Sequence, residues 1–154
     1  MDELEVRAFD LRSAEAQALI AELNAELSAL YPEEGANHFR LDPAEVAPGN
    51  GRFVIAIQGG RHVGCGAVRR IDARTAELKR MYVRREARNR GVARAVVRAL
   101  EAEARALGVG RLVLETGVRQ RAALALYRGQ GYSVIPPFGE YTASPLSVCM
   151  AKDL

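Results

Sequence analysis

The stretch Val83-Arg84-Arg85-Glu86-Ala87-Arg88-Asn89-Arg90-Gly91-Val92-Ala93 joins an expected strand to the start of an expected long helix. The first amides of a helix have no partner within the helix, and they carry the positive end of its dipole. Gly91 lets a ligand approach this backbone closely. The four arginines of the stretch add donors that match the geometry of a phosphate, although on their own they are more typical of a basic loop facing water. Together, the strand, glycine and helix context predict a pyrophosphate site.

An antiparallel meander is expected immediately before this stretch. Apolar residues alternate with smaller or polar ones in three consecutive segments, which is typical of half-buried strands. Gly59-Gly60 supplies the positive φ angles of a tight turn between the first two. The expected strands are 53–57, 62–71 and 76–83.

The chain upstream of the meander predicts one helix and one irregular segment. Ser13 caps an amphipathic helix that ends at Tyr31-Pro32. Residues 33–50 contain two further prolines, so we expect mostly irregular backbone with one short helical turn after Asp42.

Downstream of the phosphate stretch, the pattern continues as alternating helices and strands. The long helix has one apolar face and ends at Gly108. We then expect a strand at 111–115, a helix at 120–130 and strands at 131–135 and 146–151. The strand, helix, strand order from Val83 to Leu114 implies a parallel, right-handed crossover. The expected fold class is α+β, built on one mixed sheet.

Length and composition predict one soluble domain covering residues 1–154. The chain is 49% hydrophobic, which is enough for a single core, and no apolar run approaches the roughly 20 residues that cross a bilayer. We therefore expect a cytoplasmic protein with no membrane partner. Cys65 and Cys149 form no paired motif and are expected to be buried free thiols, and the isolated His38 and His62 predict no metal site.

Two other ligand classes are disfavoured by what the sequence lacks. The net charge is only +3, and no aromatic residues are interleaved with the arginine cluster at 84–94, so nucleic acid is not an expected partner. The glycine patterns typical of dinucleotide and ATP sites are also missing.

Two motifs resemble the GNAT superfamily of N-acetyltransferases. Residues 88–93 fit its Q/R-x-x-G-x-G/A signature, and residues 123–132 are similar to its A-x-x-L-Y-x-x-x-G-F/Y stretch. The resemblance covers residues 53–150 and is strongest between 76 and 132. It implies a mostly antiparallel central sheet with helices on both faces and a splayed pair of parallel strands.

The resemblance also implies the cosubstrate and the residues that bind it. In GNAT proteins the signature loop and the helix start hold the pyrophosphate of acetyl-CoA. The matching residues are Arg88, Asn89, Arg90, Gly91, Val92 and Ala93. Met81, Tyr82 and Val83 match a bulged strand whose free amides pair with pantetheine and polarise the thioester carbonyl. Gln120 stands where many relatives carry an Asn that contacts CoA.

Catalytic roles follow from the same resemblance. Tyr127 matches the tyrosine beside the CoA sulfur and is assigned as general acid, because an expelled thiolate needs a proton. Glu77 is the leading candidate for the base that takes a proton from the incoming amine, with Glu115 and Glu140 as rivals. The lack of a convincing nucleophile motif favours direct transfer in a ternary complex, and Cys149 is the residue that could overturn this.

The acceptor is expected to be an amine of a small molecule or peptide. Residues 31–50 and 136–145 should flank its cleft. The candidate lining groups are Glu33, Glu34, His38, Phe39, Glu140 and Tyr141. The alternative function is a noncatalytic acyl-CoA sensor that keeps the phosphate site, and a homodimer is left as an option.

Overall fold

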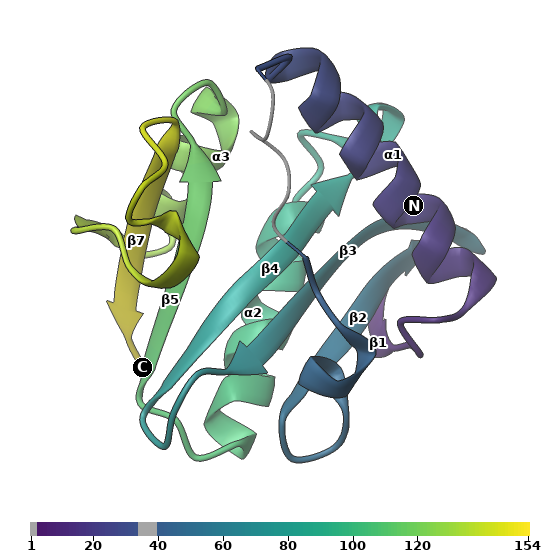
Figure 1. Ribbon diagram of the computed structural model, residues 1–154. Helices are drawn as coiled ribbons and strands as arrows, with labels where there is room; N and C mark the ends of the chain where they lie inside the picture. The colour runs from purple at the N-terminus through teal and green to yellow at the C-terminus, as the bar shows by residue number, and fades with distance from the viewer. Residues whose placement is uncertain (1–2, 34–39) are drawn as a thin grey trace.

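The computed structural model describes residues 3–33 and 40–154 of the chain. Within them, a mixed sheet of seven strands has the order β1-β2-β3-β4-β5-β7-β6 (Figure 1). The strands are β1 (Leu4–Ala8), β2 (Gly51–Gln58), β3 (Arg61–Arg70), β4 (Thr75–Val83), β5 (Arg111–Gly117), β6 (Ser133–Ile135) and β7 (Ser147–Asp153). β4 and β5 are parallel, and the other neighbouring pairs are antiparallel. The mostly antiparallel sheet of the expected α+β fold is therefore confirmed.

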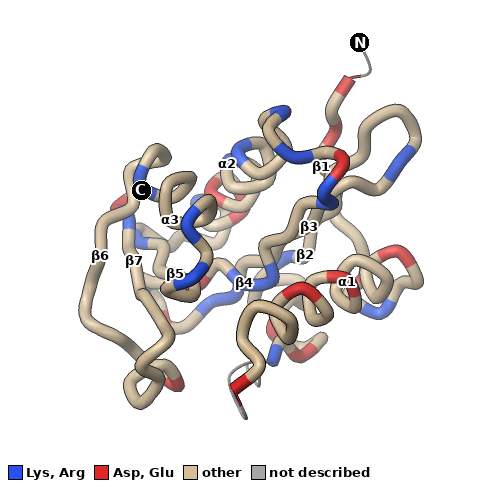
Figure 2. The backbone as a smooth tube through the Cα atoms, turned by 90° about the horizontal axis from the view of Figure 1, so that it is seen from above, with Lys and Arg blue, Asp and Glu red and all other residues tan. Residues whose placement is uncertain are grey.

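Helices cover both faces of this sheet, as predicted. They are α1 (Ala14–Leu30), α2 (Val92–Ala106) and α3 (Arg121–Gly129), with short 3-10 turns η1 (Pro43–Val46), η2 (Arg85–Ala87) and η3 (Gly139–Tyr141). Seen from above, α1 lies on one side of the sheet, and α2 and α3 lie on the other (Figure 2). The chain is thus a three-layer structure with two separate hydrophobic cores.

The two cores take alternate residues of the same strands. In β2, Phe53 and Ile55 pack against α1, whereas Val54 and Ala56 belong to the core that contains α2. Successive side chains of a strand point to opposite faces, so a strand covered on both faces is apolar throughout. This explains why the central strands are almost continuously buried.

Local signals set the helix boundaries. The Ser13 hydroxyl accepts the amide N–H of Ala16 at 3.2 Å and caps α1. Gly91 precedes α2 with a left-handed φ of 83°, and Gly108 follows it with a φ of 81°. Glycine adopts this conformation without a Cβ clash, so both ends of α2 lie where the sequence predicted them.

The structure differs from the sequence prediction at several places along the sheet; β2 starts two residues earlier, at Gly51, and β7 ends two residues later, at Asp153. β1 was not predicted, because it is only five residues long and mostly exposed. β5 continues beyond Glu115 to Gly117, since the extra residues pair with β7. β6 begins at Ser133 instead of Gly131, because the amide of Tyr132 bonds back to the carbonyl of Tyr127.

Two further expectations concern the thiols and the membrane. Cys65 and Cys149 are both free and buried, as predicted. In the part of the chain that the structure describes, no helix has the length and apolar character needed to cross a bilayer.

Gly51 provides a test of this packing, because β2 starts where the η1 turn crosses it. A Cβ at Gly51 would lie 2.1 Å from the carbonyl oxygen of Val68 and 2.5 Å from that of Glu45. Backbone atoms cannot easily yield, so Gly51→Ala should lower the free energy of unfolding by about 2–3 kcal/mol. Urea denaturation measures this value. Gly110→Ala is the matched control, since a Cβ there meets no atom within 4 Å, and it should change stability by less than about 0.5 kcal/mol. Equal stability of the two variants would contradict the packing described.

Candidate active site

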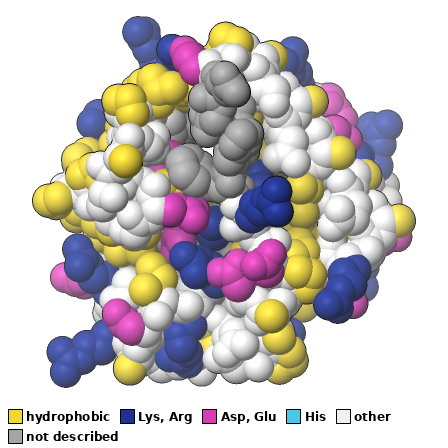
Figure 3. Space-filling model, in the orientation of Figure 1, with side chains coloured by type: hydrophobic (Ala, Val, Ile, Leu, Met, Phe, Trp, Pro, Cys, Tyr) yellow, Lys and Arg dark blue, Asp and Glu magenta, His cyan; other side chains and the backbone are white. Residues whose placement is uncertain are grey.

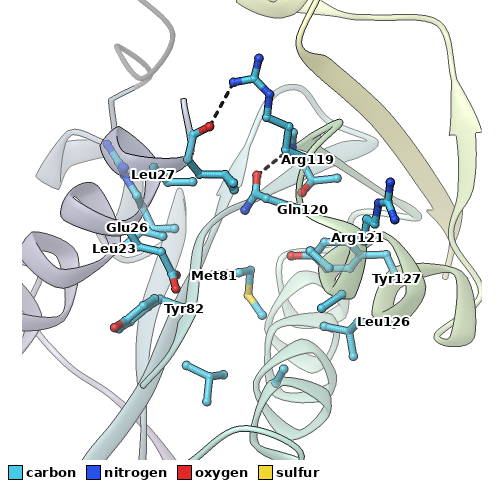
Figure 4. A pocket seen from close by; sticks show the side chains of 18 of the residues that line it. Leu23, Glu26, Leu27, Met81, Tyr82, Arg119, Gln120, Arg121, Leu126 and Tyr127 are labelled. Carbon is cyan, nitrogen blue, oxygen red and sulfur yellow. Dashed lines mark hydrogen bonds between the residues drawn. The ribbon is translucent and has the colours of Figure 1, made fainter. Parts of the chain in front are cut away.

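The two parallel strands separate after a short paired segment. β4 and β5 pair from Thr75 opposite Arg111 to Leu78 opposite Leu114. Beyond these pairs, β4 runs on to Val83 and the strands diverge (Figure 1). A cavity of about 1280 Å³ lies at this opening, lined by both strands, the starts of α2 and α3, the end of α1 and the loop before β7 (Figure 4). The splayed parallel pair implied by the family resemblance is therefore present.

A β-bulge in β4 accompanies the separation. Cys65 faces Tyr82 but Ala67 faces Lys79, so Arg80 and Met81 together stand opposite Gly66. Arg80 takes up the extra residue with a left-handed φ of 58°. A bulge bends its strand and interrupts the regular ladder. The predicted residues Met81, Tyr82 and Val83 all line the cavity, where β4 has β3 on one side only.

The start of α2 presents backbone donors to the same cavity. Gly91 is its N-cap and no side chain caps the helix, whose first internal bond runs from the amide of Ala95 to the carbonyl of Gly91. The amides of residues 92–94 consequently have no partner within the helix. A Cβ at Gly91 would meet no protein atom within 4 Å, and Gly91 lines the cavity, so this residue borders open space.

The predicted phosphate-site residues gather around this turn with one exception. The members that line the cavity are Arg88, Asn89, Gly91, Val92 and Ala93. Arg90 is exposed and is not among them. Asn89 has a left-handed φ of 64°, which helps the chain turn into α2.

Two arginine side chains that precede this turn form ion pairs with α1. The guanidinium of Arg88 donates to the Glu26 carboxylate at 2.8 and 2.9 Å and to the carbonyl of Val83 at 2.9 Å. Arg84 donates to Glu22 at 2.9 Å. Figure 2 shows the acidic positions along α1 and the basic positions of the facing loop. These two side chains thus pair with α1, which leaves the backbone of the loop and the cavity-lining Arg94 to contact an anion.

Tyr127 lies on α3 in the opposite wall of the cavity. The residue is 5% exposed, and its hydroxyl points into the cavity (Figure 4). Burial raises the pKa of Tyr127 above its ordinary value, so the hydroxyl stays protonated at neutral pH. Its ring packs edge-to-face on Tyr132, whose hydroxyl donates to the buried Glu101 at 2.9 Å. A protonated hydroxyl is therefore held toward the cavity.

Gln120 lies at the start of α3 and also lines the cavity. Its side-chain oxygen accepts the amide N–H of Gly117 at 2.8 Å. This bond fixes the turn between β5 and α3 and leaves the amino group of Gln120 as its remaining donor.

Glu115 is one of two carboxylates that line the cavity; the other, Glu26, is paired with Arg88. Its Oε2 accepts the hydroxyl of Ser147 from β7 at 2.5 Å. Burial raises the pKa of Glu115, an effect that the bond from Ser147 partly opposes. A carboxylate with a raised pKa is suited to accept a proton near neutral pH.

Glu77 is fully buried and is not among the residues that line the cavity. Its Oε1 accepts from Arg69 at 2.9 and 2.8 Å, and its Oε2 accepts the hydroxyl of Tyr141 at 2.5 Å. Arg69 also pairs with Glu45 at 2.7 Å. Glu77 is therefore closed off from solvent, and its side chain is linked to the cavity through Tyr141, which does line it.

Two cations line the same end of the cavity. Lys79 is 8% exposed, and its Nζ donates to the carbonyl of Arg40 at 2.7 Å and to Glu140 at 3.4 Å. Arg80 donates to the side-chain oxygen of Asn24 at 2.9 Å. On the face shown in Figure 3, acidic and basic side chains gather near the middle of the molecule. This end of the cavity thus contains charges of both signs.

The contacts that close the top of the opening have no signature in the sequence. The hydroxyl of Tyr31 accepts the amide N–H of Arg119 at 2.9 Å, and the Arg119 guanidinium pairs with Glu33. Gly117 leaves room for the Tyr31 ring, since a Cβ there would lie 1.8 Å from its hydroxyl oxygen. These partners lie 86 or more positions apart in the chain, so no local pattern connects them.

Three predicted lining residues, Glu34, His38 and Phe39, lie outside the described residues. Across residues 3–33 and 40–154, no group of three or more His, Cys, Asp and Glu side chains is placed to hold a metal ion.

Known proteins share this sequence and this architecture. An IAA acetyltransferase of Azospirillum brasilense is 45% identical over 138 residues, which cover 88% of each chain. A crystal structure described as a candidate acyl-CoA N-acyltransferase, from Klebsiella pneumoniae, is 33% identical with a TM-score of 0.83 and covers 98% of this chain and 97% of its own. A GNAT acetyltransferase from Elizabethkingia anophelis, solved with acetyl-CoA bound, shares the fold at 16% identity, with a TM-score of 0.70 over the whole of both chains.

The match to a known family covers most of the chain. Residues 16–132 match the profile of the Acetyltransferase (GNAT) family. This segment contains the bulged strand, the uncapped start of α2, and Tyr127. The chain therefore belongs to the GNAT family of acetyltransferases.

Proposed function

We propose that this enzyme moves the acetyl group of acetyl-CoA to a primary amine of a small molecule or peptide, by direct attack in a ternary complex. One observation carries the proposal. A single cavity joins the bare helix start at Gly91, the buried hydroxyl of Tyr127 and the carboxylate of Glu115. A diphosphate, a leaving thiolate and an incoming amine need these three groups in that order.

The residues of the cavity fit the parts of acetyl-CoA. The uncapped amides of residues 92–94 suit a diphosphate, because a helix start binds anions through its N–H groups and dipole. Arg88 and Asn89 line the cavity beside these amides, whereas Arg90 is exposed outside it. The pantetheine arm would enter between the separated strands, against the backbone of residues 81–83 and the amide of Gln120.

The proposed reaction forms one C–N bond and breaks one C–S bond. The neutral amine attacks the thioester carbonyl, and the backbone amides of the bulged strand steady the oxyanion. When the tetrahedral intermediate collapses, the C–S bonding electrons go to sulfur and Tyr127 gives its proton to the thiolate. The proton lost by the attacking nitrogen goes to a carboxylate.

Glu115 suits the role of base better than Glu77. Glu115 lines the cavity, and its pKa is raised by burial. Glu77 is fully buried and held by Arg69 and Tyr141, so it has no direct path to a substrate. Glu140 is half-exposed and not among the cavity-lining residues. We therefore assign the base to Glu115.

The assay that tests the proposal measures CoA release from acetyl-CoA with benzylamine, spermidine, lysine and an unblocked alanine dipeptide as acceptors. IAA, which appears in the name of the Azospirillum relative, is tested separately as an acceptor in the same assay. We expect at least one amine to raise CoA release well above hydrolysis. If none does while acetyl-CoA still binds, the proposed transfer to a primary amine is overturned and the acyl-CoA sensor becomes the favoured alternative.

Tyr127→Phe tests the general acid. Removing the hydroxyl leaves the thiolate without a proton donor, so kcat should fall by about a hundredfold while the KM for acetyl-CoA changes little. Steady-state kinetics with the best amine of the panel measures both. Tyr132→Phe is the control, because its hydroxyl bonds Glu101 and does not line the cavity; its kcat should stay within about threefold of wild type. An unchanged kcat in Tyr127→Phe contradicts the assignment.

Glu115→Gln tests the base through its pH dependence. Burial raises the pKa of Glu115, so in wild type kcat/KM should rise with pH through an acid limb that lies above the ordinary glutamate value of 4.5. The active form of a base is the deprotonated one, and activity is lost as pH falls through this pKa. Glu115→Gln should remove the limb and lower kcat by about a hundredfold. A variant that keeps the wild-type limb rules Glu115 out.

Gly91→Val tests the phosphate site. A branched side chain would fill the open space before α2, and the Kd for acetyl-CoA should rise at least about tenfold by calorimetry. Gly108→Val carries the same conformational strain at the other end of α2, where φ is also left-handed and the cavity is distant. It should lose similar stability but keep the wild-type Kd. Equal loss of affinity in both variants would mean that strain alone is responsible.

A further inference from the structure

The bond between Tyr141 and Glu77 fixes the direction of a hydrogen bond at the cavity wall. Both side chains are buried, and the hydroxyl of Tyr141 donates to Oε2 of Glu77 at 2.5 Å. The other oxygen of Glu77 is held by the guanidinium of Arg69. With one oxygen in an ion pair, the carboxylate keeps its second oxygen for the phenol.

This arrangement commits the only hydrogen of the Tyr141 hydroxyl. The phenol oxygen can therefore act only as an acceptor toward a molecule in the cavity that Tyr141 lines. Burial, followed by the charge of Glu77, raises the pKa of Tyr141, so the hydroxyl remains protonated at neutral pH. Glu140 and Glu115 act in the same direction, and the cations Arg69 and Arg80 also lie close enough to interact with Tyr141.

Neighbouring polar groups offer lone pairs in the same way. Ser147 donates its hydrogen to the carboxylate of Glu115, which is itself an acceptor. Among the cations at this end, Lys79 donates to Arg40 and Glu140, and one guanidinium nitrogen of Arg80 donates to Asn24. An amine nitrogen that carries two or more N–H groups can donate to the lone pairs that Tyr141, Ser147 and Glu115 offer.

We propose that Tyr141 binds the acceptor nitrogen by accepting one of its N–H groups while Glu115 accepts another, and that Glu77 is a positioning residue that sets the direction of the Tyr141 hydroxyl. This inference rests on the proposed transfer to a primary amine. It assigns Glu77 a role in amine recognition and leaves the proton transfer to Glu115.

Two variants test the inference from opposite directions. Tyr141→Phe removes the accepting oxygen, so the KM for the amine should rise about tenfold while kcat stays within about threefold. Glu77→Gln removes no atom from the cavity wall. With its oxygen kept by Arg69, the new amide group would donate to Tyr141 and turn the phenol hydrogen toward the substrate, so the KM for the amine should rise at least as much.

The double variant Tyr141→Phe with Glu77→Gln distinguishes an effect of the hydroxyl's direction from an effect of side-chain packing. Once Tyr141 is Phe, the direction of its hydroxyl no longer matters, so adding Glu77→Gln should produce little further increase in KM. Phe138→Leu is the matched control, because Phe138 packs on the Tyr141 ring at 5.2 Å between centroids but leaves the hydroxyl bond intact. Its KM for the amine should stay within about threefold of wild type.

The measurement is steady-state kinetics with the best acceptor among benzylamine, spermidine, lysine and the alanine dipeptide, alongside calorimetry of acetyl-CoA binding. We expect an increased KM for the amine in both single variants with an unchanged Kd for acetyl-CoA. If the wild type acetylates the amine and neither single variant raises the KM for it, the inference is overturned while the proposed function stands. If the increases in amine KM of the two single variants add up in the double variant, and acetyl-CoA also binds more weakly, then Tyr141 and Glu77 have only a structural role. A wild type that acetylates none of these amines overturns the proposed function as well.

Discussion

The separation of β4 from β5 is the constraint on which the site depends. Two parallel strands that share backbone bonds leave no space between them, and here they share them only as far as Leu78 and Leu114. The bulge at Arg80 bends β4 away, at the cost of a left-handed φ in a residue with a side chain. The resulting opening exposes unpaired backbone, which a buried structure tolerates only where a ligand or water can satisfy it.

The surrounding elements stabilise this opening from three sides. Ion pairs of Arg84 and Arg88 with Glu22 and Glu26 join the loop before α2 to α1. On the other side of the opening, Arg119 contacts the end of α1. The loop before β7 reaches β4 through the bond from Tyr141 to Glu77. Single exposed ion pairs stabilise little, so these contacts matter mainly because they fix where the walls of the cavity lie.

The sequence predicted those features that local patterns decide. Ser13 capped α1, Gly91 and Gly108 bounded α2, and alternation placed the meander. The contacts of Glu77 could not be predicted, because the groups that hold it, Arg69 and Tyr141, lie 8 and 64 positions away. The same reason applies to Arg88, whose guanidinium is paired with Glu26, 62 positions earlier. Side-chain partners across elements become visible only when the fold brings them together.

Calorimetry of the folded protein with acetyl-CoA and with S-acetylpantetheine, which lacks the diphosphate, tests the central claim most directly. If the bare amides at the start of α2 bind the diphosphate, acetyl-CoA should bind at least about a hundredfold more tightly than the shorter thioester. Equal affinities for the two thioesters, or no binding of acetyl-CoA, would contradict the account.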